Sequence, residues 1–254
     1  MMTYKLIHGI GVNDLPNHSE TPAYKCWNSM IGRIYSDSEQ DRCPTYRDCS
    51  IDEDWLRFSN FFEFYSEHYF DGSQLDKDIY GFGPPDISAD DGISDWPHKW
   101  HFKNPEIGRR TYGPDTCIFV SHFLNNQTFA KEKRVFKSNG LPRGVRQTES
   151  RNYEGYIKLL GEKKQSSLGR HQYPEEAEID VLSHQIENLR RLVLWCVQDP
   201  NSPKVRSSHP ARLTLGLLSH IDILERQWVQ VEDVIQDKYY EAFDLRDPKK
   251  WYER

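Results

Sequence analysis

The stretch that decides the fold has two parts: Leu75-Asp76-Lys77-Asp78, and Tyr112-Gly113-Pro114-Asp115-Thr116-Cys117-Ile118-Phe119-Val120 followed by Ser121-His122-Phe123-Leu124-Asn125-Asn126. The first part ends an aromatic run with adjacent acids. In the second part, Gly-Pro-Asp is typical of a turn and Cys-Ile-Phe-Val of a buried strand, and polar residues then open a helix. Together the two parts predict a ββα unit, a geometry that can hold one divalent cation between an Asp on the first strand and an Asn on the helix. Magnesium prefers such oxygen ligands and keeps most of its waters.

This pattern resembles the HNH homing-endonuclease-like proteins of phages, in which a Leu-Asp-Lys-Asp strand precedes a Tyr-x-Pro-x-Thr-Cys-x-Phe-Val strand and an Asn-bearing helix. Upstream residues that support the resemblance are Tyr24, Trp27, Met30, Arg33, Tyr35, Tyr46, Cys49, Trp55, Phe58 and Phe61. Further along the chain, a second set resembles the small apetala/ERF-type DNA-binding module that these proteins often carry: Gly144-Val145, Tyr153, Tyr156-Ile157, Gly161, Leu168-Gly169 and Glu175-Glu176-Ala177. The resemblance covers roughly residues 1–180.

The resemblance implies a metal-dependent endonuclease in which the ion stabilises charge on the leaving oxygen and a His takes a proton from water. It places Asp76 and Asn125 as ligands of Mg²⁺ or another divalent cation, and Thr116 where a middle Asn often stands. Lys77 stands where the general-base His is expected, and a lysine near neutral pH is protonated. The alternative bases are His122 and His68. The catalytic candidates are therefore Asp76, Lys77, Asp78, His122 and Asn125; for the two acids, surface pairing with Lys77 or nearby arginines is the competing interpretation.

Charge is distributed unevenly along the 254 residues, whose formal net charge is −6. Residues 1–130 carry 11 Lys and Arg against 20 Asp and Glu, whereas residues 131–170 carry 11 against 4. A basic segment between two acidic ones favours contact with nucleic-acid phosphates, and the competing interpretation is a solvated basic linker. The candidate DNA-binding residues are Arg143, Arg146, Arg151, Lys158, Lys163, Lys164 and Arg170.

The chain as a whole predicts an α+β fold. Helical periodicity is present over 22–36, 51–70 and 211–243, residues 37–50 are expected to form a polar loop, and a helix is expected to begin at Pro174. Residues 144–170 alternate around turns at 149–152, 161 and 166–169, which predicts a three-stranded antiparallel sheet. The expected domains are an HNH-like ββα-metal domain over 1–130, a basic DNA-binding module over 131–198 and a helical segment over 199–254.

Residues 79–111 predict a long inserted loop, and its cluster from Trp96 to His101 either binds a metal or base or packs the loop onto the core. The five cysteines have no paired spacing and are expected to be reduced thiols; a zinc site from Cys26, Cys43, Cys49 and a histidine is the alternative. Residues 1–16 lack the order of a signal peptide, and no apolar run is long enough for a membrane span. These features predict a protein of the host-cell cytoplasm.

Three functional hypotheses follow. The first is an endonuclease that nicks or cuts double-stranded DNA. The second is a catalytically inactive relative that binds DNA as a repressor or a counter-defence factor. The third is a protein–protein inhibitor, in which the acidic N-terminal part mimics DNA and occupies the basic groove of a host or defence protein. The amphipathic helix over 211–243 either packs on the preceding helix or joins two copies into a homodimer.

Overall fold

The computed structural model describes residues 6–79, 111–127 and 134–243, and the expected loop at 79–111, with its Trp96–His101 cluster, lies almost wholly outside them. Helices and small sheets alternate along the chain, which confirms an α+β fold. The chain forms two compact units: residues 1–128 with 195–216, and residues 129–194 with 217–254. The division into three domains stays a prediction.

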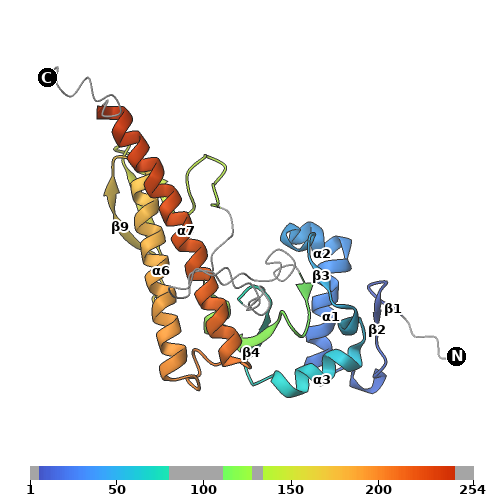
Figure 1. Ribbon diagram of the computed structural model, residues 1–254. Coiled ribbons are helices and arrows are strands. Elements are labelled where there is room, and N and C mark those ends of the chain that lie inside the picture. Colours follow the sequence, from blue (N-terminus) through green and yellow to red (C-terminus); the bar gives the residue numbers. More distant parts are fainter. Residues whose placement is uncertain (1–5, 80–110, 128–133, 244–254) are drawn as a thin grey trace, which may run out of the picture. The chain divides into compact units, whose positions relative to one another are not determined.

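The first unit is built around two helices, α1 (Pro22–Tyr35) and α3 (Phe58–His68) (Figure 1). Thr21 caps α1 by accepting a hydrogen bond from the backbone N–H of Tyr24 at 3.2 Å, and Pro22 stands at the first helical position, where no N–H is needed. The expected helix over 22–36 is thereby confirmed. Between α1 and α3 lie α2 (Asp37–Arg42) and short 3-10 turns at Pro44–Tyr46 and Glu53–Leu56.

Two expectations for this region are wrong. Residues 37–50 are not all loop, because they contain α2, and residues 51–70 are not one helix. Ile51 belongs to β3 (Ser50–Ile51), which pairs in parallel with β5 (Thr111–Tyr112). The carboxylate of Asp52 then accepts a hydrogen bond from Asp54 N at 3.0 Å and closes a tight turn, and Arg57 is extended, so α3 begins only at Phe58.

The predicted strand–strand–helix order is present. Strand β4 (Ser73–Asp76) pairs antiparallel with β6 (Ile118–Ser121), with Asp76 opposite Ile118, and α5 (His122–Asn125) follows directly. On the other side of β6, Ser121 N donates to Arg206 O and Ser208 N donates to Phe119 O, so residues 206–208 extend the sheet. A separate hairpin joins β1 (Leu6–Ile7) and β2 (Gly11–Val12).

The core of the first unit is largely aromatic. Trp27, Trp55, Phe58 and Phe61 are at most 1% exposed and pack between α1 and α3. The indole Nε1 of Trp27 donates to the carbonyl of Trp55 at 2.7 Å, which satisfies the buried N–H. This packing fixes the two helices relative to the β4–β6 sheet, since Phe64 of α3 also stacks on Phe119 of β6.

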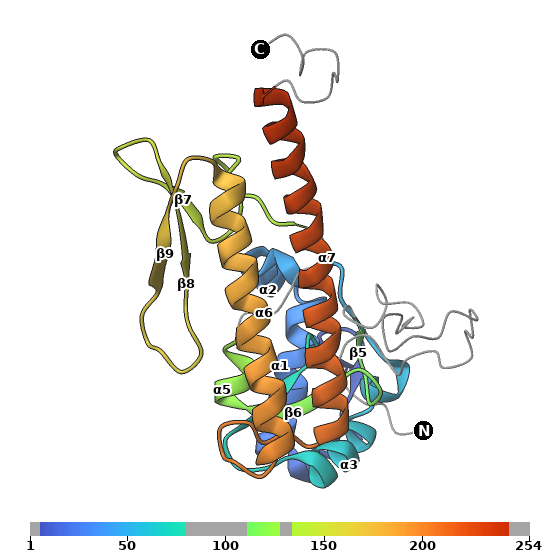
Figure 2. The same cartoon turned by 60° about the vertical axis from the view of Figure 1, so that its left-hand side comes forward.

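The second unit contains a three-stranded antiparallel sheet, β7 (Val145–Gln147), β8 (Tyr153–Ile157) and β9 (Ser166–His171), beside the first half of α6 (Pro174–Gln198) (Figure 2). The three predicted strands are confirmed, but residues 166–169 lie in β9 rather than in a turn. Gly155 lets the sheet approach the helix closely, because a Cβ there would lie 2.8 Å from the carbonyl oxygen of Ala177.

Within the second unit, α6 runs beside α7 (Pro210–Phe243). Trp228 donates to Ser183 Oγ at 3.0 Å and Arg190 pairs with Glu225 at 2.7 Å. The helices expected at Pro174 and over 211–243 are confirmed, and Leu182, Ile186 and Leu189 of α6 are buried. Among the described residues, none of the helices is both long and apolar enough to cross a membrane.

Candidate functional site

Asp76 lies at the end of β4 with its carboxylate turned into the protein. Its Oδ1 accepts hydrogen bonds from the backbone N–H groups of Asp78 at 2.8 Å and Ile79 at 2.7 Å, which fixes the turn after the strand. Burial, and next the negative charge of Asp78, raise the pKa of Asp76 from 3.8 to about 6, against the opposing effect of the two amides and Lys77. Asp76 is therefore a buried acid held in a fixed direction, not a surface ion-pair partner.

Lys77 follows directly after β4 and is also buried. Its Nζ lies 2.5 Å from Asp78 Oδ1 and faces the rings of Tyr46 and Tyr112 at 5.9 and 5.7 Å. Burial by itself lowers the pKa of Lys77, but the carboxylate of Asp78 outweighs burial and raises it above its usual range. The amine is thus protonated and cannot accept a proton from water.

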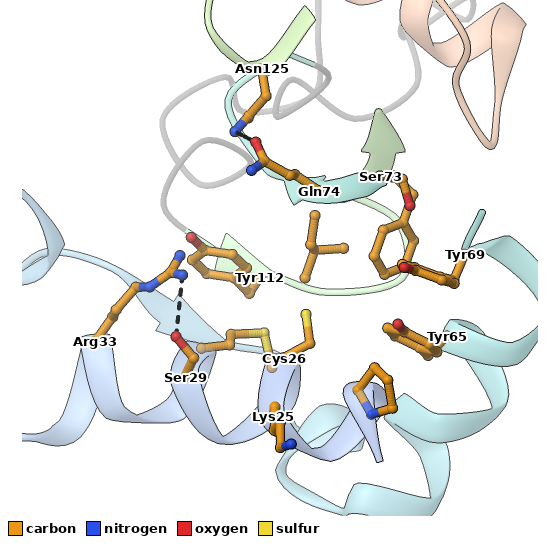
Figure 3. Close-up of a pocket in the computed structure, with 14 residues that line it drawn as sticks. Lys25, Cys26, Ser29, Arg33, Tyr65, Tyr69, Ser73, Gln74, Tyr112 and Asn125 are labelled. Atoms are coloured by element: carbon orange, nitrogen blue, oxygen red, sulfur yellow. Dashed lines mark hydrogen bonds between the residues drawn. The ribbon is translucent and has the colours of Figure 1, made fainter. Parts of the chain in front are cut away.

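Asn125, at the end of α5, reaches across to β4. Its Nδ2 donates to Gln74 Oε1 at 2.5 Å (Figure 3). Gln74 and Asp76 are two residues apart on the strand and share a face, so the structure brings Asn125 to the strand and face that carry Asp76. Thr116, by contrast, donates to the carbonyl of Thr111 at 2.6 Å and serves the turn before β6.

The two candidate bases are placed differently. His122 is exposed, and its Nε2 lies 2.8 Å from the Nδ2 of Asn126 one turn later. His68, at the end of α3, packs its ring on that of His209 with a centroid separation of 4.3 Å. Burial lowers the pKa of His68, and Arg212 adds to that effect while Glu67 opposes it. Both histidines belong to the first unit, and neither contacts Asp76 in an interaction that the structure records.

The donor chemistry around Asp76 suits a hard cation. Within residues 6–79, 111–127 and 134–243, no hydrogen bond involves Asp76 Oδ2 or Asn125 Oδ1, so each side chain has one oxygen to offer. A carboxylate and an amide oxygen, with waters, are ligands that Mg²⁺ accepts. The described residues contain no cluster of three or more His, Cys, Asp or Glu that could hold a metal, and the cysteines, including Cys26, Cys43 and Cys49, are free thiols.

The outer face of the three-stranded sheet carries a row of charges. Arg146, Glu154 and Arg170 are cross-strand neighbours on β7, β8 and β9, on the side away from α6. Arg146 donates to Glu154 Oε2 at 2.7 Å, and Ser167 donates to Glu154 Oε1. These hydrogen bonds lower the pKa of Glu154. Although paired, the side chain of Arg146 is 60% exposed, so the carboxylate orients its guanidinium without covering it.

The other predicted DNA-binding residues surround this row. Arg143 is exposed just before β7, and Arg151 lies in the β7–β8 turn with a positive φ of 62°. Lys158, Lys163 and Lys164 are exposed at the opposite end of the sheet, after β8. We call the outer sheet surface with these residues the basic sheet face. Lys137 and Tyr156, which sequence reasoning missed, belong to it: Lys137 Nζ lies 5.3 Å from the ring centre of Tyr156.

A second feature that sequence reasoning missed is a cavity of about 460 Å³ in the first unit, lined by α1, α3, β4, Tyr112, Phe119 and Asn125 (Figure 3). Helix α1 contributes Lys25, Cys26, Ser29 and Arg33, whose spacing of three and four is that of one helix face. That polar stripe beside the buried Trp27 stripe was the available signal. Burial raises the pKa of the Cys26 thiol to about 11, against the effect of Arg33, so the cavity holds no reactive thiolate.

No known family model matches the sequence, and neither curated proteins nor solved structures include one with significant similarity to the chain.

Proposed function

We propose that this protein binds double-stranded DNA through the basic sheet face. The main observation that supports the proposal is the row formed by Arg146, Glu154 and Arg170. In this row, the carboxylate of Glu154 orients the exposed guanidinium of Arg146. Arginines held in this way can donate two hydrogen bonds to a guanine edge, and their neighbours at the ends of the sheet can reach phosphates.

The dimensions of the sheet support this proposal. Three strands span two inter-strand spacings of about 4.8 Å, or roughly 10 Å, and the major groove is about 12 Å wide. The face can therefore enter the groove, with Arg151 at one end of the strands and Lys163 and Lys164 at the other. The close contact of β8 with α6 at Gly155 stiffens the sheet, which keeps this charge pattern in place.

Fluorescence anisotropy with labelled duplexes selected from a random-sequence pool tests the proposal. We expect Arg146→Gln and Arg170→Gln each to weaken specific binding by about 1–3 kcal/mol, and Lys164→Gln to lower the salt slope by about one unit. Arg191→Gln is the matched control, because Arg191 is equally exposed in the same unit but lies on α6 and pairs with Glu187. Absence of any duplex binding at low salt, or equal affinity of the two sheet variants and wild type, would refute the proposal.

A second function, metal-dependent cleavage of the bound DNA, is favoured by the hydrogen bond from Asn125 of α5 to Gln74, which lies on the same strand as Asp76. Asp76 and Asn125 would hold the cation, which when bound would stabilise negative charge at the phosphate. Because Lys77 is protonated, the proton acceptor would have to be another group, and His122 beside Asn125 is the candidate.

Incubation of plasmid and phage genomic DNA with the protein, with and without Mg²⁺, tests cleavage. Asp76→Asn keeps an oxygen for the two backbone amides but removes the charge, so we expect it to abolish cleavage while duplex binding persists. Asp71→Asn, at an exposed turn, is the control. Equal cleavage by wild type and Asp76→Asn would exclude this role. Duplex binding without cleavage by the wild type would leave a DNA-binding protein such as a repressor, and binding to a host protein without DNA affinity would favour the inhibitor hypothesis.

A further inference from the structure

The cavity of the first unit differs in charge from the segment that surrounds it. Residues 1–130 contain nearly twice as many acids as bases, 20 against 11. Among the described residues, the 14 that line the cavity nevertheless include Lys25 and Arg33 and no Asp or Glu. The cavity is thus lined by cations within a segment that is otherwise rich in carboxylates. Its local potential is therefore positive, which favours an anionic ligand.

Arg33 is prepared for such a ligand. Its Nη2 donates to Ser29 Oγ at 3.2 Å, its guanidinium carbon lies 5.9 Å from the ring centre of Tyr46, and the group is only partly exposed. Within the part of the chain that the structure describes, Arg33 forms no ion pair. A guanidinium that neutral partners hold in place, without a carboxylate to neutralise it, retains its charge for a bound phosphate or carboxylate.

Opposite Arg33, the cavity wall is aromatic (Figure 3). The rings of Tyr65 on α3 and of Tyr69, which follows the helix, stack at 4.5 Å with an angle of 13° between their planes, and Phe119 meets both edge-on. Tyr69 is 37% exposed, so the pair is open to a further ring. Planar ligands stack on such surfaces, and this wall lies across the cavity from the positive charge.

The remaining side of the cavity carries amides. Gln74 and Asn125 are joined by their own hydrogen bond and present their remaining polar atoms at the edge of β4. Amide side chains are the groups that form paired hydrogen bonds with the edges of nucleobases. The cavity thus combines a cation, a stacking wall and an amide pair within about 460 Å³, in the range of about 300–1,000 Å³ that small-molecule sites occupy.

We propose that this cavity binds a nucleotide, with its phosphate at Arg33 and its base against Tyr69 and the Gln74–Asn125 amides. Lys25 lies eight residues before Arg33 on the same helix, about 12 Å away, and provides a second cation at the rim. The nucleotide comes either free in solution or as an unpaired residue of a DNA strand, and the same chemistry recognises both. The inference does not depend on the basic sheet face, although the cavity shares Asn125 with the candidate cleavage site.

Isothermal titration calorimetry of the full chain in EDTA tests this inference. The probes are dAMP, dTMP, adenosine and inorganic phosphate, together with short single-stranded oligothymidylates with and without a 5′-phosphate. We expect millimolar or tighter binding of a mononucleotide, with adenosine and inorganic phosphate each at least about 10-fold weaker because each lacks one half of the ligand. Tighter binding of the oligonucleotide than of dTMP would identify the strand as the source, and the reverse order would identify the free nucleotide.

Variants assign the site. Arg33→Gln should weaken mononucleotide binding about 10-fold or more and Tyr69→Leu about 5-fold or more. Lys25→Gln should also weaken mononucleotide binding. Because Lys25 is exposed, this substitution should not disturb folding, so it tests the site even if the Arg33 variant misfolds. Matched controls are Arg42→Gln and Tyr173→Leu, which remove an exposed arginine and an exposed tyrosine outside the cavity.

Two results would overturn the inference. One is no binding of any mononucleotide up to about 5 mM, well beyond a millimolar Kd. The other is binding that Tyr69→Leu leaves unchanged and that inorganic phosphate matches, which would show a simple anion site. Duplex binding distinguishes this test from that of the proposed function: the sheet variants should lose duplex affinity and keep nucleotide binding, and the cavity variants should do the opposite.

Discussion

Removal of the buried negative charge at Asp76 should stabilise the metal-free protein at neutral pH. In Asp76→Asn, the amide oxygen still accepts the hydrogen bonds from Asp78 and Ile79, so the turn after β4 is kept. What changes is the cost of holding an ionised carboxylate away from water. That cost is what raises the pKa of Asp76 from 3.8 to about 6.

The magnitude follows from proton linkage. A shift of about two units at about 1.36 kcal/mol per unit corresponds to about 3 kcal/mol. Because the folded-state pKa is the higher one, the folded protein holds the proton more tightly. Stability from this group is therefore fully present below pH 3.8, declines as pH rises and is lost above about pH 6. About half of the loss has occurred by roughly pH 5, and the full difference applies at about pH 8.

Urea unfolding of wild type and Asp76→Asn in EDTA, across about pH 4.5 to 8, measures this difference. We expect the variant to be more stable at pH 8 by up to about 3 kcal/mol and the gap to shrink on acidification. Asp71→Asn should show no such pH-dependent gap, because Asp71 is exposed. A variant that is equal to or less stable than wild type at pH 8, with a parallel pH profile, would refute the reasoning. A gain in stability combined with a loss of cleavage would show that the buried charge is kept for function.

Two further predictions concern each unit separately. Gly155→Ala should destabilise the second unit by about 1–3 kcal/mol, because the new Cβ would lie 2.8 Å from the backbone oxygen of Ala177, which cannot rotate away. Thermal unfolding measures this loss of stability, and an unchanged melting temperature would contradict the prediction. His209→Gln should make the stability of the protein less sensitive to acid. Burial, Arg212 and His68 lower the pKa of His209, so the stability that this residue contributes above its ordinary pKa of 6.5 is lost as pH falls. The urea unfolding midpoints at about pH 7.5 and 5.5 should therefore differ less in the variant than in wild type.

The local elements could be predicted from the sequence because their signals are local. Helical spacing and a proline at the first position placed α1, and the alternation around Gly161 placed the strands of the three-stranded sheet. These features depend on which residues lie three, four or two positions apart, and the chain contains that information directly.

Only the tertiary structure decided where helices break and which side chains meet. The expected helix over 51–70 is interrupted because Ile51 pairs with Tyr112, a partner about 60 residues away that no local pattern reveals. Strand register likewise put Glu154 between Arg146 and Arg170, and helix packing placed Arg33 opposite Tyr69. The sequence by itself determined the elements and their charges. Long-range pairing determined the sites, because the contacts that form a site are between residues distant in the chain.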